Sequence, residues 1–235
     1  MINIRRSNER KHTDRGWLDS RFTFSFAEYR DPASMGFRAL RVMNEDLIAP
    51  GKGFGPHAHR DMEILTYVLG GWLLHRDSMG EQHVLGPNEI QMMSAGSGVV
   101  HSEYNASETE PVHLMQIWIL PEAEDLEPSY QQVAFTPEAK RGRLHLLAAP
   151  VTNEKPMTVI RQDARVYAGE FCADQTVKHE IRRGRYAWIQ VVKGSVSLNR
   201  QLLTEGDAAA VSGEPHLTFT GMQPAGGELL LFDLQ

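Results

Sequence analysis

The sequence predicts an all-β fold with two barrel domains in one chain. Short apolar runs alternate with glycine-containing turns along the 235 residues, and long helical patterns are scarce. Many short strands separated by such turns are typical of β-sandwiches and β-barrels. The second half also repeats the turn pattern of the first, and the length suffices for two modest domains with their own cores.

The strands of the first half are expected where β-branched and aromatic residues cluster between turn residues. Turns are expected at Gly70–Gly71, Ser78–Gly80, Gly86–Asn88 and Ala95–Gly98. The strands themselves are predicted at Phe22–Phe26, Phe37–Val42, Glu63–Leu69, Trp72–His75, Glu89–Met93 and His113–Leu120.

An internal repeat supports the division into two domains. Tyr67–Leu74 resembles Gln190–Leu198 around a central glycine, and Gly98–His101 has a fainter copy in Gly213–His216. The acidic stretch 121–137 between the halves is interpreted as a connector. We therefore predict a metal-binding barrel over residues 1–125 and a degenerate, metal-free barrel over residues 126–235.

Composition narrows the classes of partner. The net charge of −6, from 24 basic and 30 acidic residues, gives no electrostatic argument for nucleic acid. The single cysteine, Cys172, excludes an internal disulfide and is expected to be a small buried residue. The first residues lack the apolar core of a secretory signal, and no run approaches a membrane span. We expect a cytoplasmic protein, monomeric or weakly dimeric.

Two pairs of residues with metal-ligand chemistry stand out. His57 and His59 are two residues apart, and His101 and Glu103 repeat that spacing. On a strand, residues two apart point to the same face. Two such strands can present three imidazoles and one carboxylate to a single divalent metal ion. The pattern therefore predicts one transition metal per chain, drawn from Fe, Mn, Co, Ni, Cu and Zn, held by His57, His59, His101 and Glu103.

The context of these residues resembles the two sequence motifs of the cupin superfamily. The first motif is matched by Gly51, His57, His59, Glu63 and Gly70. The second is matched by Gly98, His101 and Asn105, but Gly96 stands where cupins usually have proline. The resemblance implies jelly-roll barrels, and so a two-barrel cupin.

Longer segments resemble the pirin family within the cupins, and its bacterial quercetinase-like members in particular. They cover residues 10–120 densely and the second half loosely; the matching stretches include Arg15–Leu18, Phe22–Phe26, Pro56–Tyr67, Gly70–Gly80 and Met93–Glu103. The resemblance implies a metal-dependent dioxygenase that opens the central ring of a flavonol such as quercetin and releases carbon monoxide. It also implies Glu103 as the catalytic base.

The fourth ligand has two candidates. Most cupins would use the carboxylate of the first motif, here Glu63, whereas the pirin resemblance implies Glu103. Glu103 shares a strand face with His101. Glu63 shares parity with His57 and His59 only if the chain runs straight between them, and a bend at residues 60–62 would remove it. We predict Glu103 as the ligand and Glu63 as a supporting carboxylate.

Several other residues are weighed between functional and structural roles. His75, Asp77 and Ser78 are expected to hydrogen-bond within a turn. His179 and His216 in the second half lack partners at ligand spacing. An aromatic-substrate pocket is one role, and core packing the commoner one, for Trp17, Phe22, Phe24, Met92, Met93 and Trp118.

Two alternatives to the dioxygenase stay open from the sequence. Pirins also resemble non-enzymatic regulators, in which the metal state changes a protein-binding surface. Cupins also include isomerases and lyases that act on small acids. A deep aromatic pocket beside the metal residues would count against the small-acid reading, and a small arginine-lined pocket would favour it.

Overall fold

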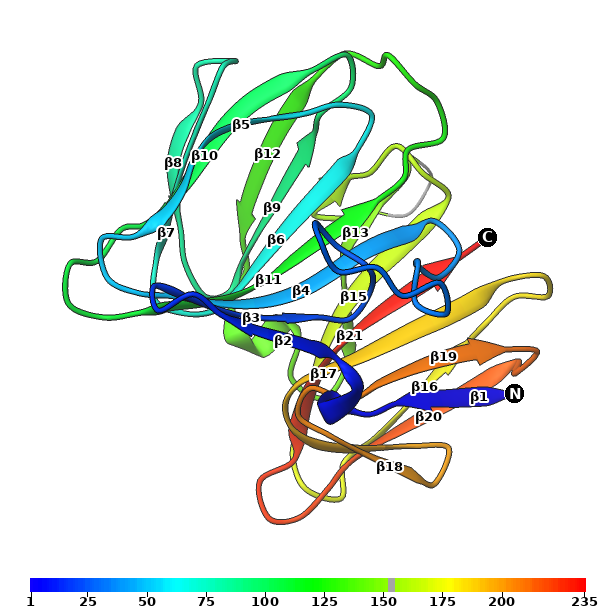
Figure 1. Ribbon diagram of the computed structural model, residues 1–235. Helices are drawn as coiled ribbons and strands as arrows, with labels where there is room; N and C mark the ends of the chain where they lie inside the picture. The colour runs from blue at the N-terminus through cyan, green and yellow to red at the C-terminus, as the bar shows by residue number, and fades with distance from the viewer. Residues whose placement is uncertain (152–154) are drawn as a thin grey trace. The chain divides into compact units, whose positions relative to one another are not determined.

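A computed structural model describes residues 1–151 and 155–235, which form two compact units. The N-terminal unit comprises residues 11–135 and 158–162, and the C-terminal unit comprises residues 1–10, 136–157 and 163–235. Apart from two 3-10 turns, η1 (Ser7–Glu9) and η2 (Pro137–Ala139), the regular elements of the described chain are strands, as predicted (Figure 1). The described part of the chain has no helix long and apolar enough to cross a membrane.

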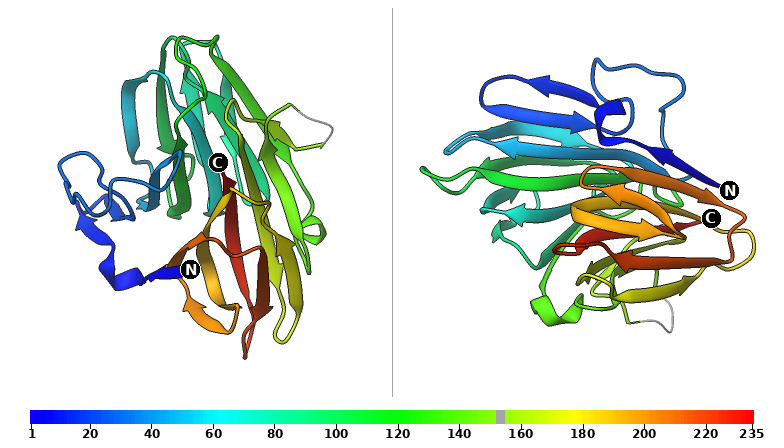
Figure 2. Two further views of the ribbon diagram at one scale, coloured as in Figure 1. Left: turned by 90° about the vertical axis from the view of Figure 1, so that its right-hand side faces the viewer. Right: turned by 90° about the horizontal axis from the view of Figure 1, so that it is seen from below.

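Two antiparallel sheets build the N-terminal unit. One has the strand order β12-β9-β6-β11-β4-β3-β2, and the other has the order β5-β10-β7-β8 (Figures 1 and 2). Their bounds are β2 (Lys11–Asp14), β3 (Leu18–Phe22), β4 (Leu40–Ile48), β5 (Gly53–His59), β6 (Glu63–Gly70), β7 (Leu73–Asp77), β8 (Gln82–Leu85), β9 (Glu89–Ser94), β10 (Val99–Asn105), β11 (Val112–Ile119) and β12 (Ser129–Ala134), with the short β14 (Thr158–Val159) also in this unit.

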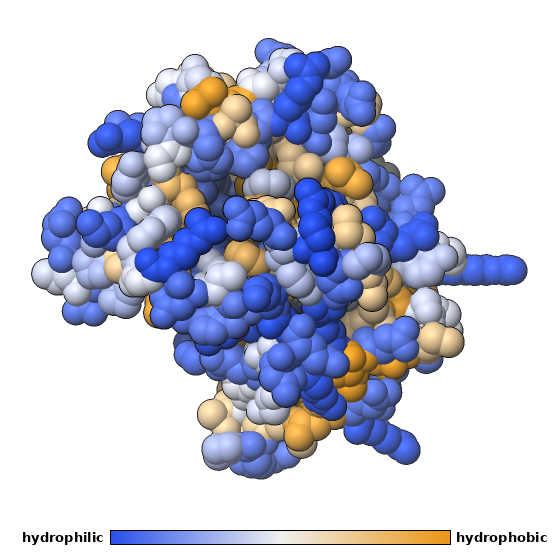
Figure 3. Space-filling view, in the orientation of Figure 1, coloured by the Kyte–Doolittle hydropathy of each residue, from blue (hydrophilic) through white to orange (hydrophobic). Residues whose placement is uncertain are grey.

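Apolar side chains from both sheets share one core in this unit. Ile48, Val68 and Leu114 from the larger sheet pack with Leu73 and Leu85 from the smaller one, and all are essentially fully buried. Burial of apolar surface on this scale is the main stabilising contribution to a sandwich. On the face of the protein seen in Figure 3, hydrophilic side chains predominate and apolar ones are scattered among them.

The C-terminal unit repeats the plan. One sheet follows the order β1-β19-β17-β21-β15-β13. On the second face, β16 pairs with β20, and both β18 and β20 pair with the end of β17. Its bounds are β1 (Ile2–Arg5), β13 (Leu144–Ala149), β15 (Ala164–Phe171), β16 (Thr176–Glu180), β17 (Tyr186–Leu198), β18 (Gln201–Thr204), β19 (Ala208–Ser212), β20 (His216–Gly221) and β21 (Gly227–Leu234).

The boundaries of the two units differ from the predicted division into residues 1–125 and 126–235 in two places. Residues 1–10 belong to the C-terminal unit because β1 pairs antiparallel with β19, Ile2 opposite Val211 (Figure 1). Residues 126–135 belong to the N-terminal unit because β12 pairs with β9, Ser129 opposite Ser94. Both pairings join residues far apart in sequence, which local composition does not reveal.

Three local expectations were wrong. The stretch 121–137 is not a plain connector, since it contains β12. The strand expected at Phe22–Phe26 lies earlier, at β3, because Ser25 turns the chain by hydrogen bonds to Asp31 and Ser34. Cys172 is exposed rather than buried: it follows the buried Phe171 at the end of β15, where the strand gives way to a turn closed by Gln175.

Candidate metal centre

Strands β5 and β10 bring the predicted ligand residues together. They pair antiparallel, with His57 directly opposite His101. Along β10, every second side chain from Val99 to Asn105 is buried, so His101 and Glu103 share the inner face. On β5 the exposed Ala58 separates the half-buried His57 and His59. The alternation expected from the sequence is therefore the alternation that positions these side chains.

The three histidines form a compact cluster. Their ring centroids lie 4.8 Å apart for His57 and His59, 4.4 Å for His57 and His101, and 4.8 Å for His59 and His101. One ring nitrogen from each lies within 4.8 Å of the others, as in a group able to hold one metal ion. Three imidazoles at this separation suit a divalent transition metal.

A bulge and a glycine shape the strands beside the cluster. The register between β10 and β5 shifts between His101 and Glu103, a β-bulge of the kind that re-aims side chains near functional sites. Gly53 makes the close approach possible, because a Cβ there would lie 2.2 Å from the Glu103 carbonyl oxygen. The close approach falls at Gly53, two residues after Gly51 of the sequence motif.

Two of the three histidines, His59 and His101, have lowered pKa values. Burial, together with the neighbouring rings of His101 and His57, lowers the pKa of His59 to about 4. Burial and the rings of His57 and His75 lower the pKa of His101 to about 3. Neutral imidazole is the form that binds metal.

Two nitrogens indicate how the rings would present their lone pairs. The His57 Nδ1 lies 2.8 Å from the Gly55 carbonyl oxygen, to which it donates as N–H, so its Nε2 carries the lone pair. The Nε2 of His101 is buried without a hydrogen-bond partner. An orphaned acceptor is costly unless a ligand completes it. This donor set therefore fits a bound metal ion.

Glu103 is oriented by a hydrogen-bonded amide. The Gln116 side chain, from β11, donates from Nε2 to both carboxylate oxygens of Glu103, at 3.1 and 2.9 Å. The Thr66 hydroxyl in turn donates to Gln116 Oε1 at 3.2 Å. Glu103 forms a second potential ligand group with His101 and His75, all three buried. The sequence did not single out Gln116, which has no motif of its own.

Glu63 is committed elsewhere. It lies at the start of β6, and Asp61 just before it has a positive φ of 49°, which turns the chain after His59. The Ser94 hydroxyl and the Arg161 backbone N–H both donate to Glu63 Oε2, at 2.9 and 3.0 Å. Glu63 does not belong to either potential ligand group among the described residues. The bend weighed at residues 60–62 is present.

A cavity of about 410 Å³ opens beside the histidines. Trp17, Phe22 and Trp118 line it, which is the pocket role weighed for them from the sequence. Phe24, Met92 and Met93 do not; they are buried core residues. His57, His59 and Glu103 also line the cavity, together with side chains that the sequence did not single out, namely Phe26, Phe54, Ser20, Asn44, Asp46 and Gln116.

Asp46 is a buried acid in the cavity wall. The Ser20 hydroxyl donates to its Oδ1 at 2.5 Å. Burial raises the pKa of Asp46 to about 7, an effect that the Ser20 hydrogen bond opposes and the nearby Glu103 charge reinforces. Carboxyls with strongly shifted pKa values in a cavity are typical of functional sites.

The corresponding strands of the C-terminal unit look different. Strand β16 pairs with β20, Glu180 opposite His216, and both of these side chains are exposed. His179 is mostly buried against the Tyr167 ring, with its Nε2 3.8 Å from Asp233. Within the described ranges, 1–151 and 155–235, both potential metal-ligand groups lie in the N-terminal unit.

Two jelly-roll units, one with a histidine cluster opening onto an aromatic cavity, define a two-domain protein of the cupin class. The chain belongs to the pirin family. Residues 4–119 match the family model for pirin, and residues 146–234 match the model for a quercetinase C-terminal cupin domain.

Relatives of known name span the whole chain. A quercetin 2,3-dioxygenase from Escherichia coli is 46% identical over 234 residues, which is 100% of this chain and 99% of the relative. A pirin-like protein from Caulobacter vibrioides is 38% identical and covers 94% of each chain. The structure of the bacterial pirin YhhW from E. coli in complex with nickel(II) is 44% identical, with a TM-score of 0.92 over 100% of this chain and 99% of that one.

Proposed function

We propose that this protein is a metal-dependent dioxygenase that opens the central ring of a flavonol such as quercetin and releases carbon monoxide. The observation that carries the proposal is the cavity of about 410 Å³, which is lined by aromatic side chains together with His57, His59 and Glu103. Its volume falls in the range of small-molecule sites, roughly 300–1,000 Å³. The E. coli relative named quercetin 2,3-dioxygenase, at 46% identity, supports the substrate class.

His57, His59, His101 and Glu103 would hold the metal. When bound, a divalent transition metal would act as a Lewis acid for a substrate oxygen and, if redox-active, would exchange electrons with dioxygen. The nickel complex of the E. coli pirin makes nickel the first metal to test. We infer one metal per chain, in a cytoplasmic protein that is monomeric or weakly dimeric.

Glu103 has the chemistry of the general base. A carboxylate oxygen would take the proton of the flavonol 3-hydroxyl, which makes the central ring electron-rich. The Gln116 amide holds the carboxylate in one orientation through both of its oxygens. Holding the acceptor in place lowers the reorganisation that proton transfer requires.

Aromatic walls favour a planar aromatic substrate over a small acid. Trp17 and Phe54 meet edge to face at 5.5 Å, and Phe26 meets Trp118 at 5.3 Å, so the rings are fixed by one another. Such rings gain by stacking on a flat ligand and exclude water around the reacting ring. Arg15 is the one arginine of the cavity wall, whereas a site for small acids would be expected to be rich in arginine.

The test is turnover by the reconstituted protein. Metal-free protein would be loaded separately with nickel, iron, manganese, cobalt and copper, then mixed with quercetin and dioxygen. We expect quercetin loss, oxygen uptake and carbon monoxide release in equal amounts with at least one metal. Glu103→Gln should lower kcat by about 10²–10⁴-fold, while Glu63→Gln, the matched carboxylate outside the site, should stay close to wild type. Absence of carbon monoxide with every metal would refute the proposal.

A further inference from the structure

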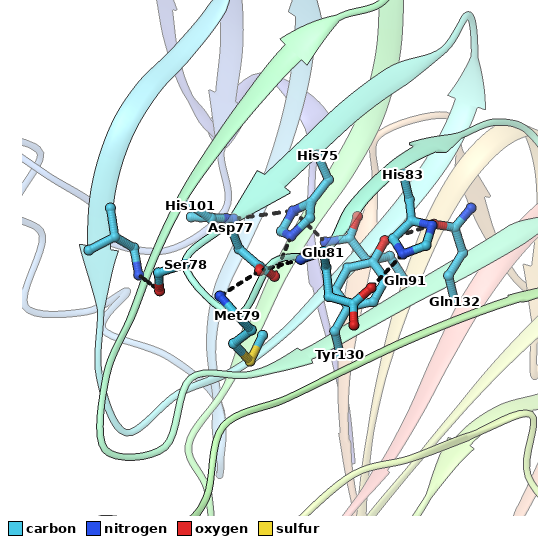
Figure 4. Close-up of polar contacts among 11 residues, drawn as sticks. His75, Asp77, Ser78, Met79, Glu81, His83, Gln91, His101, Tyr130 and Gln132 are labelled. Carbon is cyan, nitrogen blue, oxygen red and sulfur yellow. Dashed lines mark hydrogen bonds and ion pairs between the residues drawn. The ribbon is translucent and has the colours of Figure 1, made fainter.

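A buried polar chain runs from His101 to two residues of the neighbouring strand, and none of the three lines the cavity. His75 and Asp77, both on β7, lie beside His101 on the neighbouring strand β10 (Figure 4). The side chains of His75 and Asp77 are each 0% exposed. The distances are 3.5 Å between His101 Nδ1 and His75 Nδ1, and 2.9 Å between His75 Nε2 and Asp77 Oδ2.

The direction of these hydrogen bonds follows from what each atom can do. A carboxylate accepts only, so His75 must carry its proton on Nε2 and donate it to Asp77. The Nδ1 of a neutral His75 is then an acceptor, and its one lone pair is shared between the Gln91 amide at 3.3 Å and the His101 ring at 3.5 Å. His101 must therefore donate from Nδ1, which leaves the lone pair on its Nε2.

The far end of the chain is also fixed. The backbone N–H groups of Met79 and Glu81 donate to Asp77 Oδ1 at 2.9 and 3.1 Å, so the buried carboxylate is supplied with donors on both oxygens. The Tyr130 ring stacks on His75 at 4.8 Å and on His83 at 5.0 Å, between the two imidazoles (Figure 4). His75 is thus held in position on its face as well as at both nitrogens.

We propose that Asp77 and His75 form a positioning pair for the metal ligand His101. The pair fixes the Nδ1–H tautomer of His101, aims its Nε2 at the cluster with His57 and His59, and strengthens it as a donor. Carboxylates commonly support metal-binding histidines directly; here the support passes through a second imidazole. This inference rests on the metal centre of the proposed function but needs no flavonol chemistry.

The variants separate positioning from mere burial. His75→Leu fills the space but offers no acceptor to His101. His75→Asn places an amide where the Nδ1 edge of the ring was and can restore an acceptor. Asp77→Asn keeps the shape, removes the charge, and lets its amide donate to His75, which favours the wrong tautomer of His101. The matched control is His83→Leu, which removes the other ring stacked on Tyr130 without touching His101.

Nickel dissociation constants of the full-length variants, measured by competition with a chelator, decide the matter. We expect His75→Leu and Asp77→Asn to bind nickel about 10–100-fold more weakly, His75→Asn to recover part of that loss, and His83→Leu to match wild type. The visible spectrum of the cobalt-loaded protein should shift in Asp77→Asn and not in His83→Leu, a change that lost packing alone would not produce.

Affinities within twofold of wild type for both His75→Leu and Asp77→Asn would overturn the inference, as would an equal loss in His83→Leu. If His75→Leu fails to fold, Asp77→Asn and His75→Asn carry the test. Failure of the proposed activity is distinguishable, since wild type would then bind nickel and respond to these variants without consuming quercetin. A wild-type protein that binds no metal through His101 would refute both proposals.

Discussion

Two buried carboxyl groups in each unit differ in how readily they ionise. In the N-terminal unit, burial raises the pKa of Asp46 and of Glu63. In the C-terminal unit, hydrogen bonds and cations outweigh burial and lower the pKa of Asp207 and of Asp233. Asp46 and Glu63 of the N-terminal unit therefore resist ionisation, whereas Asp207 and Asp233 of the C-terminal unit ionise readily because each is paired with an arginine.

The surroundings of these acids explain the difference. Asp207 accepts from the Arg6 guanidinium and from the Ser7 and Thr204 backbone, which ties β1 and η1 to the sheet. Asp233 faces His179 and accepts a hydrogen bond from the half-buried Arg185. Removing the cation beside a buried carboxylate is strongly destabilising, whereas a carboxyl with a shifted pKa in a cavity wall, such as Asp46, is typical of a functional site. This comparison supports a functional N-terminal unit and a structural C-terminal unit.

The largest expected effect separates the histidines of the two units. His57→Ala or His101→Ala should weaken metal binding by at least about 100-fold, because each removes a ligand outright. His179→Ala, in the C-terminal unit, should leave the metal content unchanged. Equilibrium dialysis with nickel, followed by elemental analysis, measures both, and loss of metal from the His179 variant would break the comparison.

The next effect concerns the ion pairs of the C-terminal unit. Arg185→Ala should cost about 3–5 kcal/mol of unfolding free energy, because it leaves the buried Asp233 with His179 alone and also removes a 2.9 Å contact to Asp163. Arg60→Ala is the matched control in the N-terminal unit. Its side chain is 60% exposed, so its pairs with Asp61 and Asp125 should contribute less than about 1 kcal/mol. Denaturant titrations compare the two variants, and equal midpoints would contradict the prediction.

A pH-dependent effect is expected from Asp46. The unfolded side chain loses its proton near its ordinary pKa of 3.8, whereas the folded one keeps it up to about 7. The folded state binds more protons in that window, so the stability contribution is fully present below pH 4 and falls as the pH rises towards 7. The loss is at most about 4 kcal/mol, from the size of the shift.

Asp46→Asn should remove this dependence of stability on pH. Unfolding of metal-free wild type and variant, followed from pH 4 to pH 8, checks it, because the curves should diverge in favour of the variant as the pH rises. Parallel curves would show that Asp46 ionises normally in the folded protein.

The smallest effect distinguishes the two glutamates of the first unit. Glu63→Gln weakens the hydrogen bonds from Ser94 and Arg161, at a cost of about 1–2 kcal/mol. It should leave nickel binding unchanged, whereas Glu103→Gln should weaken it. Stability from chemical denaturation and affinity from chelator competition give the two readouts. A Glu63 variant that lost nickel would reinstate Glu63 as the fourth ligand.

The histidine cluster could be predicted from local spacing, whereas the residues that reach the site through long-range strand pairing could not. The two-residue spacing of His57 with His59 and of His101 with Glu103 sufficed, because strand alternation depends only on neighbours. Gln116, Phe54 and Asp46 reach the site from other strands, and no motif marks them. The placement of residues 1–10 beside β19 likewise depends on a pairing of distant segments.

The repeat was visible for the same local reason. Gly71 ends the turn after β6 with a φ of 77°, and Gly194 has a φ of 67° at the matching place. The sequence did not reveal that β6 and β7 are separate strands while β17 runs unbroken from Tyr186 to Leu198. Strand β17 is continuous because it pairs with β18 and β21, whose sequences lie outside the repeated segment.

The most direct test of a metal centre confined to the N-terminal unit is an anomalous difference map from crystals of the nickel-loaded protein. The expected result is one strong peak per chain, within bonding distance of His57, His59, His101 and Glu103, and no peak beside His179 or His216 in the C-terminal unit. A peak in the C-terminal unit, or a nickel ion held by Glu63 in place of Glu103, would contradict it.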